Sequence, residues 1–199
     1  MGKRLLDITV AALGLLLLSP VLLLIALAVR LESPGPALFR QRRVGLHGKE
    51  FEILKFRSMR AAAGSGGPLI TVTGDRRITR VGALIRATKA DELPQLWNVL
   101  RGDMSLVGPR PEVPRYVALY SAEQRRVVLS VRPGITDEAS IAFADESSLL
   151  AAAADPESCY TTEILPRKLA LYEKYVASRS TVGDIGIILR TLLRVLRRK

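Results

Sequence analysis

The hydropathy pattern opens with 22 uncharged residues, from Ile8 to Val29. At about 1.5 Å of rise per residue, an α-helix of this length reaches across the hydrocarbon of a bilayer. Ser19 and Pro20 lie in its middle, and a proline inside a helix removes a backbone donor and bends the helix. The pattern therefore predicts either a kinked helix that crosses the membrane or a helix that enters, breaks at these two residues and returns.

Basic residues flank this apolar run on both sides. Lys3 and Arg4 precede it, and residues 30–60 hold eight Lys or Arg against three Asp or Glu. Positively charged flanks stay on the cytoplasmic side of a membrane, so both ends of the run are predicted to be cytoplasmic. We therefore favour a re-entrant hairpin over residues 1–30, in which the Ser19 hydroxyl bonds to a carbonyl one turn earlier. The run lacks the small-residue cleavage site of a secretory signal peptide.

The pattern after the run changes to short β-prone stretches and turns. Residues 33–45 and 48–59 flank the turn signal "LHG" and are predicted to form an antiparallel hairpin close to the membrane. The stretch from Ala61 to Gly74 is rich in small and turn-forming residues. It predicts a loop that either closes over a substrate or only connects two elements.

Helical periodicity dominates the rest of the chain. The first predicted helix has apolar residues at helical spacing, namely Ile78, Val81, Leu84 and Ile85. A second helix is predicted from about Glu92 to Arg101, with Asp91 as its N-cap, Pro94 in its first turn and Gly102 at its end.

Two further helices are predicted near the C-terminus. Asp155 and Pro156 are typical of a helix start, and the helix that follows carries Leu165, Leu169, Leu171 and Tyr172. The last helix has one apolar face and one basic face, made of Leu189, Leu192, Leu193 and Leu196 and of Arg190, Arg194, Arg197 and Arg198. This basic amphipathic helix could lie on anionic lipid, or it could bury its leucines against the domain.

Composition narrows the possible partners. About 170 residues follow the apolar run, enough for one domain over residues 31–199. The net charge of +11 indicates an anionic partner: nucleic acid, an acidic membrane surface or a phosphorylated substrate. The apolar run favours the last two. A single cysteine, Cys159, excludes an internal disulfide, and a single histidine, His47, excludes a histidine-based zinc site or triad.

Asp91 and Glu92 allow two interpretations. In the first, Asp91 caps a helix, Glu92 complements the helix dipole, and neither residue reacts. In the second, the stiff loop "GPRP" (residues 108–111) brings Arg110 to the same place, where an arginine recognises phosphate. An ionised aspartate there could attack phosphorus and form an acyl phosphate, provided that a divalent cation offsets the charge repulsion.

The string "DELPQLWNVLRGDMSLVGPRP" (residues 91–111) resembles the bacterial sugar transferase family of monotopic polyprenyl-phosphate phosphoglycosyl transferases. The upstream strings "LLDI" and "KFRSM" and the downstream string "RPGIT" strengthen this resemblance, which covers about the first 136 residues. It implies an α+β, mainly helical fold: an N-terminal re-entrant helix-break-helix, a small antiparallel β-hairpin, and amphipathic interfacial helices around one catalytic domain. No further module precedes the hairpin, so the minimal catalytic form of the family is expected.

The resemblance also implies an activity. The family moves a phosphosugar from a UDP-sugar to undecaprenyl phosphate and releases UMP, the first membrane step of bacterial glycoconjugate synthesis. By similarity, Asp91 is the nucleophile of a ping-pong reaction, Glu92 helps to bind Mg²⁺ together with Asp91, and Arg110 holds phosphate. The expected location is the cytoplasmic face of the bacterial inner membrane.

Other site residues follow from the same resemblance. Lys55 and Arg86 match basic positions that meet substrate phosphates or anionic lipid headgroups. Arg132, Pro133 and Gly134 form a turn expected near the nucleotide, and Ser19 and Pro20 match the pair at which the family's membrane helix breaks.

The resemblance weakens after Thr136. The segment from Asp137 to Tyr175 departs from the family pattern and has no assigned role. The acidic residue that many members carry before the final helix is also unassigned, because Tyr172 and Glu173 both fall near its place.

Two other function classes fit less well. A membrane-tethered protein that binds nucleic acid or another polyanion would explain the charge but gains nothing from adjacent carboxylates. The ten aromatic residues also form no series interleaved with basic ones, as stacking on bases would require. An inactive scaffold protein is disfavoured because Asp91 and Glu92 are both present. Uracil, ribose and diphosphate are common to all UDP-sugars, so the motifs predict the reaction but neither the sugar nor the pathway.

Overall fold

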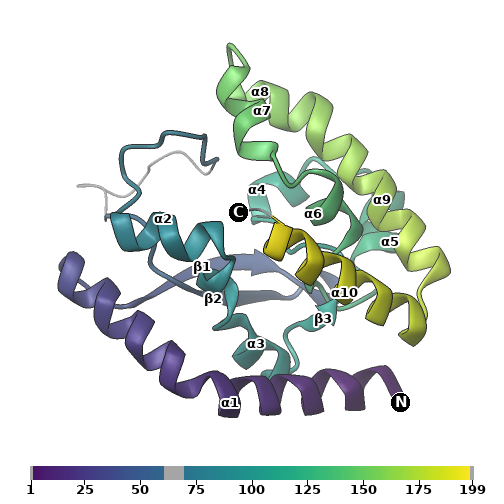
Figure 1. Ribbon diagram of the computed structural model, residues 1–199. Coiled ribbons are helices and arrows are strands. Elements are labelled where there is room, and N and C mark those ends of the chain that lie inside the picture. The colour runs from purple at the N-terminus through teal and green to yellow at the C-terminus, as the bar shows by residue number, and fades with distance from the viewer. Residues whose placement is uncertain (1, 61–69, 198–199) are drawn as a thin grey trace.

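A computed structural model describes residues 2–60 and 70–197 of the chain (Figure 1). Most of the loop predicted over Ala61–Gly74 lies outside the described residues. The helices and strands are α1 (Gly2–Glu32), β1 (Leu38–Val44), β2 (Glu50–Phe56), α2 (Arg80–Ala87), α3 (Gln95–Arg101), β3 (Ser105–Val107), α4 (Pro114–Val117), α5 (Ala122–Val128), β4 (Gly134–Thr136), α6 (Glu138–Ala142), α7 (Glu146–Ala152), α8 (Pro156–Cys159), α9 (Leu165–Ser178) and α10 (Thr181–Arg197). Short 3₁₀ turns, η1 (Leu46–Gly48) and η2 (Ala90–Glu92), and a π-helical turn, η3 (Tyr160–Ile164), complete them.

Helix α1 passes through Ser19 and Pro20 without interruption, and its ribbon bends along its length (Figure 1). Pro20 has no N–H to donate to the carbonyl of Leu16, four residues earlier. The Ser19 hydroxyl donates to that carbonyl at 2.8 Å instead. The predicted bond from Ser19 is therefore confirmed, but the predicted break into two helices is wrong, because the carbonyl that Pro20 leaves unpaired has a substitute donor.

Both ends of α1 are bonded to the rest of the molecule. Near its start, the buried carboxylate of Asp7 accepts hydrogen bonds from the Ser105 hydroxyl at 2.9 Å and from the Leu106 N–H at 3.1 Å. At its end, the buried Arg57 guanidinium donates to the carbonyls of Val29 at 3.1 Å and Ser33 at 2.7 Å. Val29 belongs to the last turn of α1, whose carbonyls lack intrahelical donors, and Ser33 directly follows the helix. One body of protein thus holds both termini of the helix.

The surface of α1 between its two ends is apolar and exposed. Helix α1 is long and apolar enough to span a membrane, and only 6% of its most apolar 18-residue window is buried. A core helix of a globular protein would bury most of this surface. The exposed leucines of α1 therefore need another apolar medium, which is compatible with membrane association.

The predicted hairpin is confirmed. Strands β1 and β2 pair antiparallel from Leu38 opposite Phe56 to Val44 opposite Glu50, and the turn η1 joins them. Helix α3 packs on β2 through Asn98, which is fully buried. Its amide donates to the Glu52 carbonyl at 2.7 Å, and its side-chain oxygen accepts from the Leu54 N–H at 3.0 Å.

Helix α3 differs from the prediction at its start. It begins at Gln95 with Pro94 at the N-cap, whereas Asp91 and Glu92 belong to the separate turn η2. The prediction that Asp91 caps this helix is therefore wrong. Gly102 ends the helix as predicted, at φ 92°, a conformation that glycine adopts without strain.

A second small sheet was not predicted. Strands β3 and β4 are parallel, and each has only three residues. At their ends, a Cβ added to Gly134 would lie 2.1 Å from the Gly108 nitrogen, so the two backbones approach as only glycine allows.

Helices α4 to α9 cover the other side of the hairpin (Figure 1). The predicted helix start at Asp155 is confirmed by its bonds to the N–H groups of the first turn of α8. Leu165, Leu169 and Tyr172 of α9 are buried in the largest apolar cluster, as their spacing predicted.

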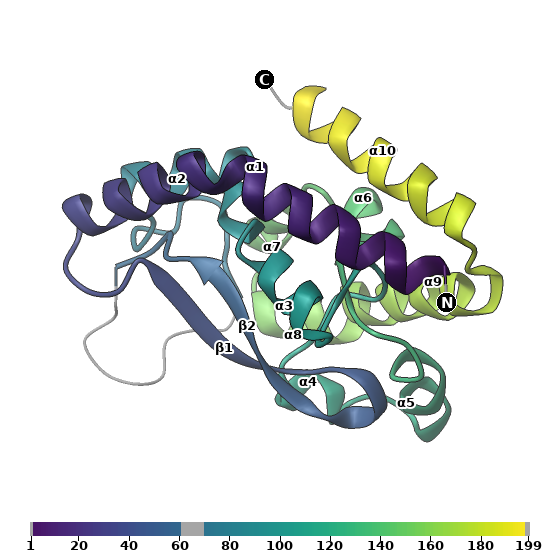
Figure 2. The same ribbon diagram turned by 90° about the horizontal axis from the view of Figure 1, so that it is seen from below.

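Helix α10 keeps its leucines in solvent. Leu189, Leu192, Leu193 and Leu196 are each more than half exposed, so the alternative that they pack against the domain is wrong. In Figure 2, α1, α2 and α10 lie along one edge of the molecule. The exposed apolar residues of α1 and α10 thus gather on one side.

We expect Asn98→Ala to destabilise the fold, because it removes a fully buried side chain and leaves the Leu54 N–H and the Glu52 carbonyl of β2 without their partner. The loss should be about 2–4 kcal/mol, a fall in melting temperature of roughly 5–15 °C. Thermal unfolding in detergent measures it. Arg101→Ala, at an exposed position of the same helix, should change the free energy of unfolding by less than about 0.5 kcal/mol. Equal melting temperatures for the two variants would contradict this role of Asn98.

Candidate active site

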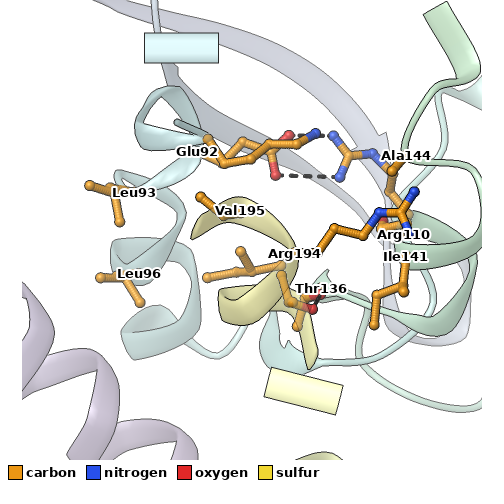
Figure 3. Close-up of a pocket in the computed structure, with 13 residues that line it drawn as sticks. Glu92, Leu93, Leu96, Arg110, Thr136, Ile141, Ala144, Arg194 and Val195 are labelled. Carbon is orange, nitrogen blue, oxygen red and sulfur yellow. Dashed lines mark hydrogen bonds and ion pairs between the residues drawn. The ribbon is translucent and has the colours of Figure 1, made fainter. Parts of the chain in front are cut away.

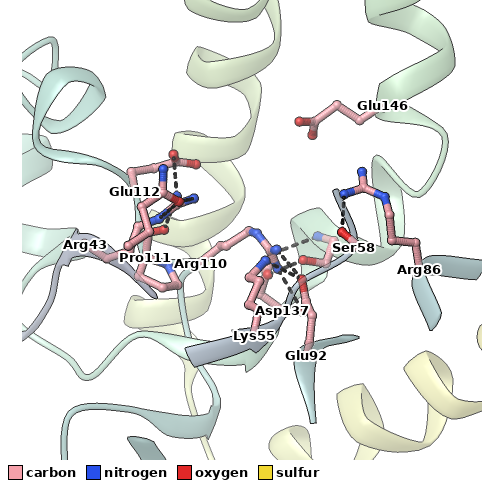
Figure 4. A network of polar contacts seen from close by, with 12 residues as sticks. Arg43, Lys55, Ser58, Arg86, Glu92, Arg110, Pro111, Glu112, Asp137 and Glu146 are labelled. Atoms are coloured by element: carbon pink, nitrogen blue, oxygen red, sulfur yellow. Dashed lines mark hydrogen bonds and ion pairs between the residues drawn. The ribbon is translucent and has the colours of Figure 1, made fainter. Parts of the chain in front are cut away.

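Three of the predicted site residues meet at one carboxylate. The Glu92 Oε1 atom lies 2.5 Å from Arg110 Nη2 and 2.9 Å from Lys55 Nζ. Lys55 comes from β2, Glu92 from the turn η2, and Arg110 from the loop after β3. In Figure 4 the Glu92 carboxylate faces both cations. Three predicted site residues from segments far apart in the sequence thus converge.

Backbone geometry explains why Glu92 points there. Lys89 adopts the left-handed conformation, with φ 58°, and this reverses the chain between α2 and the turn that carries Asp91 and Glu92. A non-glycine residue in this conformation is uncommon and often marks a functional site. Arg110 follows the close contact of Gly108 with Gly134, which fixes where its loop begins.

The three charges alter one another's pKa. Burial alone would raise the pKa of Glu92, but the charges and hydrogen bonds of Arg110 and Lys55 lower it well below its usual value. Glu92 in turn raises the pKa of Arg110 well above the ordinary arginine value. Burial lowers the pKa of Lys55 to about 8, against a partial rise from Glu92. Glu92 is therefore a fixed negative charge, while Lys55 loses its proton near pH 8.

Asp91 is different from its neighbour. It is only 7% exposed, and its Oδ1 atom has no hydrogen-bond partner within residues 2–60 and 70–197. Burial raises the pKa of Asp91, and the adjacent charge of Glu92 raises it further, whereas Lys55, Lys89 and Arg86 lower it. A buried, unpaired carboxylate oxygen is costly for stability and is typical of a functional group.

Asp91 and its neighbours line a cavity of about 620 Å³, the polar cavity. Its ionisable lining comprises Arg43, Lys55, Arg86, Lys89, Arg110 and Lys168 and the acids Asp91, Glu92, Glu112 and Glu146. Cations outnumber carboxylates, so the polar cavity suits an anionic ligand. Arg86 reaches the Ser58 hydroxyl at 3.5 Å and lies in this lining, as its predicted phosphate role requires.

The turn Arg132, Pro133 and Gly134 lies elsewhere. Arg132 is exposed and donates to the Gly102 carbonyl at 2.9 Å, and none of the three residues lines the polar cavity. Gly134 instead supports the loop of Arg110 through its contact with Gly108. In this structure the turn contributes to the site by positioning the loop that carries Arg110.

Sequence reasoning missed several residues in the divergent segment. Asp137 is 2% exposed, accepts hydrogen bonds from the N–H and hydroxyl of Ser140, and lies near Arg110 in Figure 4. Burial raises the pKa of Asp137. The helix-capping pattern of Asp137 and Ser140 was the available signal. Lys168 forms an ion pair with Glu146, and both line the polar cavity. No sequence motif indicated this pair.

Another buried acid, Asp184, lies in the first turn of the last helix. Its carboxylate pairs with Lys3 of α1 and accepts from the Tyr175 hydroxyl at 2.8 Å. The acidic residue expected before the final helix has its place near Tyr172 and Glu173 in the sequence, about ten residues earlier than Asp184. Tyr172 is instead a core residue.

The carboxylates of Asp91 and Glu92 suit a magnesium ion whose remaining ligands would come from a substrate and water. No cluster of three His, Cys, Asp or Glu residues that could hold a metal occurs in the described part of the chain. Mg²⁺ is, however, commonly held by one or two carboxylates together with substrate phosphates and water. Asp91 Oδ1 is unpaired, and Glu92 Oε2 has only a 3.4 Å contact with Arg110. These two oxygens could serve as protein ligands.

Comparison with known proteins relates the whole chain to one family. The model of the family described as bacterial sugar transferase matches residues 1–198. The UDP-glucose:undecaprenyl-phosphate glucose-1-phosphate transferase of Caulobacter vibrioides is 43% identical over 192 residues, covering 96% of this chain and 68% of that protein. The enzyme of the same name from Escherichia coli is 39% identical over 200 residues, covering 96% of this chain and 39% of that protein.

A third relative is named for a different sugar. The UDP-N-acetylgalactosamine-undecaprenyl-phosphate N-acetylgalactosaminephosphotransferase of Aeromonas hydrophila is 45% identical over 144 residues, covering 70% of this chain and 33% of that protein. The chain therefore spans about two thirds of the first relative and less than two fifths of the other two.

The lowered pKa of Lys55 predicts how this residue reacts. Acetylation requires the uncharged amine, so the acetylation of Lys55 should reach half its maximal rate near pH 8 and not near the ordinary lysine value of 10.5. Glu92→Gln should move that midpoint to lower pH, because the charge of Glu92 raises the pKa of Lys55. Mass spectrometry of the acetylated peptides measures both. The exposed Lys49 is the internal reference. If the Lys55 midpoint were the same in wild type and in Glu92→Gln, the pairing of Lys55 with Glu92 would be contradicted.

Proposed function

Because the chain belongs to the bacterial sugar transferase family, we propose that it moves a phosphosugar from a UDP-sugar to undecaprenyl phosphate and releases UMP. The three relatives are named for undecaprenyl phosphate and for UDP-glucose or UDP-N-acetylgalactosamine. The observation that carries the proposal is the buried, unpaired Oδ1 of Asp91 in a cavity lined by cations. The reaction is the first membrane step of bacterial glycoconjugate synthesis.

In the first half-reaction, the diphosphate of the UDP-sugar lies among Lys55, Arg86 and Arg110. An oxygen of the Asp91 carboxylate attacks the phosphorus that carries the sugar. The bond from this phosphorus to the bridging oxygen breaks, and UMP leaves with that oxygen. The product is an aspartyl phosphosugar. The cations hold the phosphate oxygens and so reduce the repulsion between two anions.

In the second half-reaction, a phosphate oxygen of undecaprenyl phosphate attacks the same phosphorus. The bond between phosphorus and the Asp91 oxygen breaks, which yields a polyprenyl diphosphate sugar and restores the carboxylate. Glu92 does not exchange protons, because Arg110 and Lys55 keep its pKa well below the usual range. Its role is to orient Arg110 and Lys55 toward the phosphates.

Magnesium belongs to the same proposal. Asp91 and Glu92 would hold the ion on the protein side, and the diphosphate of the substrate would complete its coordination. A bound Mg²⁺ supplies positive charge that stabilises the leaving phosphate and favours the ionised form of Asp91. This charge offsets the burial that raises the pKa of Asp91.

We further propose that the protein lies at the cytoplasmic face of the bacterial inner membrane, and that the bend of the unbroken helix α1 (Figure 1) keeps both of its ends on that side. A straight helix of 31 residues is about 46 Å long, enough to cross a bilayer. A crossing helix would separate its ends by the membrane, whereas Asp7 and Arg57 bond the two ends of α1 to one domain. The net charge of +11 suits anionic lipid headgroups.

Substitution of the nucleophile tests the covalent step. Asp91→Asn should lower turnover by about 10³-fold or more, because a neutral amide does not form the acyl phosphate. Wild-type protein incubated with UDP-sugar alone should gain the mass of one phosphosugar on the peptide that contains Asp91, and the variant should not. Asp155→Asn, at an exposed helix cap far along the chain, is the matched control and should keep both. Normal turnover by Asp91→Asn would refute the mechanism.

Removal of divalent cations tests the metal. Excess EDTA should lower UMP release by about 10²-fold or more, and added Mg²⁺ should restore it. The melting temperature should change little in EDTA, because the two carboxylates hold the ion only together with substrate. Full turnover in EDTA would exclude the magnesium part of the proposal and leave the Asp91 step standing.

A further inference from the structure

A second cavity adjoins the site, between α3, α6 and α10, and we call it the α10 groove. It has a volume of about 140 Å³, and its apolar lining comprises Leu93, Leu96, Ile135, Ile141, Ala144 and Val195. Figure 3 shows the Glu92–Arg110 pair along one wall, with Ile141 and Val195 near it. No predicted site residue other than Glu92 and Arg110 lines this groove.

The α10 groove and the polar cavity meet at shared residues. Lys89, Glu92 and Arg110 line both cavities, whereas Asp91 and Lys55 line only the polar one. An anionic group in the groove beside these residues would therefore meet Lys89 and Arg110, the cations that also line the polar cavity. The two cavities approach one reacting centre from different sides.

The groove offers little to a polar ligand. The hydroxyls of Thr136 and Thr191 bond to each other at 2.6 Å, and the Thr191 hydroxyl also lies 2.9 Å from the Ile187 carbonyl. A uracil ring or a sugar would have to leave several polar atoms unpaired there. An apolar chain loses nothing, so the lining favours hydrocarbon.

The surroundings of the groove match a lipid. Val195 lines the groove from α10, and on the same helix Leu192, Leu193 and Leu196 are exposed at 55%, 52% and 68%. Helices α10 and α1 lie along the same edge of the molecule (Figure 2), and both carry exposed apolar residues. Arg194, also in the lining, adds a cation beside this edge.

We propose that the α10 groove holds the first isoprene unit of the polyprenyl phosphate, with its phosphate at Lys89 and Arg110. A cavity of about 150 Å³ accommodates benzene, a six-carbon ligand, so the groove has room for roughly one five-carbon unit. The remaining chain follows the exposed leucines of α10 into the membrane. This inference rests on the proposed function and assigns it a separate acceptor site.

A bulky substitution in the groove tests this site. Val195 is half-buried, so Val195→Trp should fill the groove with little strain on the core. The KM for polyprenyl phosphate should rise about tenfold or more, whereas the KM for UDP-sugar should stay within about twofold. Val182→Trp, at an 81% exposed position near the start of the same helix and outside the lining, should leave both constants within about twofold. Equal rises in the two constants for Val195→Trp, or no rise, would overturn the inference.

Photolabelling tests the site without relying on turnover. A polyprenyl phosphate with a diazirine on its first isoprene unit should label α3, α6 or α10 at groove residues, and unlabelled polyprenyl phosphate should reduce the label. Val195→Trp should abolish it. Label confined to the exposed face of α1 would overturn the inference. Wild-type protein that shows this label but releases no UMP from UDP-sugars would contradict the proposed function and leave the lipid site intact.

Discussion

The arrangement of the site depends on the buried carboxylate of Glu92. It is 8% exposed and pairs with Arg110 at 2.5 Å and with Lys55 at 2.9 Å. A buried charge must be paired, and its loss would leave two cations close together with nothing between them. The Glu92 carboxylate therefore fixes the relative positions of three segments: the β1–β2 hairpin, the turn η2 and the loop after β3. The negative charge of Glu92 also reaches Asp91, where it raises the pKa.

Helix α1 is hydrogen-bonded to the strand that leads to Arg110. Asp7 bonds to the Leu106 N–H in β3, and Lys3 donates to the Val107 carbonyl at 3.0 Å. Arg110 follows Val107 by three residues, across the tight contact of Gly108. The position of α1 is thus linked to that of Arg110, so under the proposed function the depth of α1 in lipid would set where Arg110 meets phosphate. A site that joins a water-soluble donor to a lipid acceptor requires such a fixed depth.

Local patterns predicted what local forces decide. The β-hairpin follows from alternation and a turn signal, and the end of α3 follows from Gly102. The pairing of Glu92 with Lys55 is not local, since they are 37 positions apart, and only the family resemblance assigned both to the site, Lys55 to substrate phosphates and Glu92 to Mg²⁺. The N-cap at Asp91 was wrong because the left-handed Lys89 starts a separate turn, which no propensity indicates. The parallel β3–β4 contact and the burial of Asp137 also depend on tertiary packing.

The two cavities bear on why the reaction would use a covalent intermediate. The polar cavity contains Asp91 and most of the cations, and the α10 groove contains neither Asp91 nor Lys55. Direct transfer would require donor and acceptor to occupy both cavities at once, with two anionic phosphates around Arg110. If Asp91 first takes the phosphosugar, UMP departs and removes negative charge before the lipid phosphate arrives. The shared cations then serve one incoming phosphate at a time, so the positive charge at Lys89 and Arg110 suffices for both half-reactions.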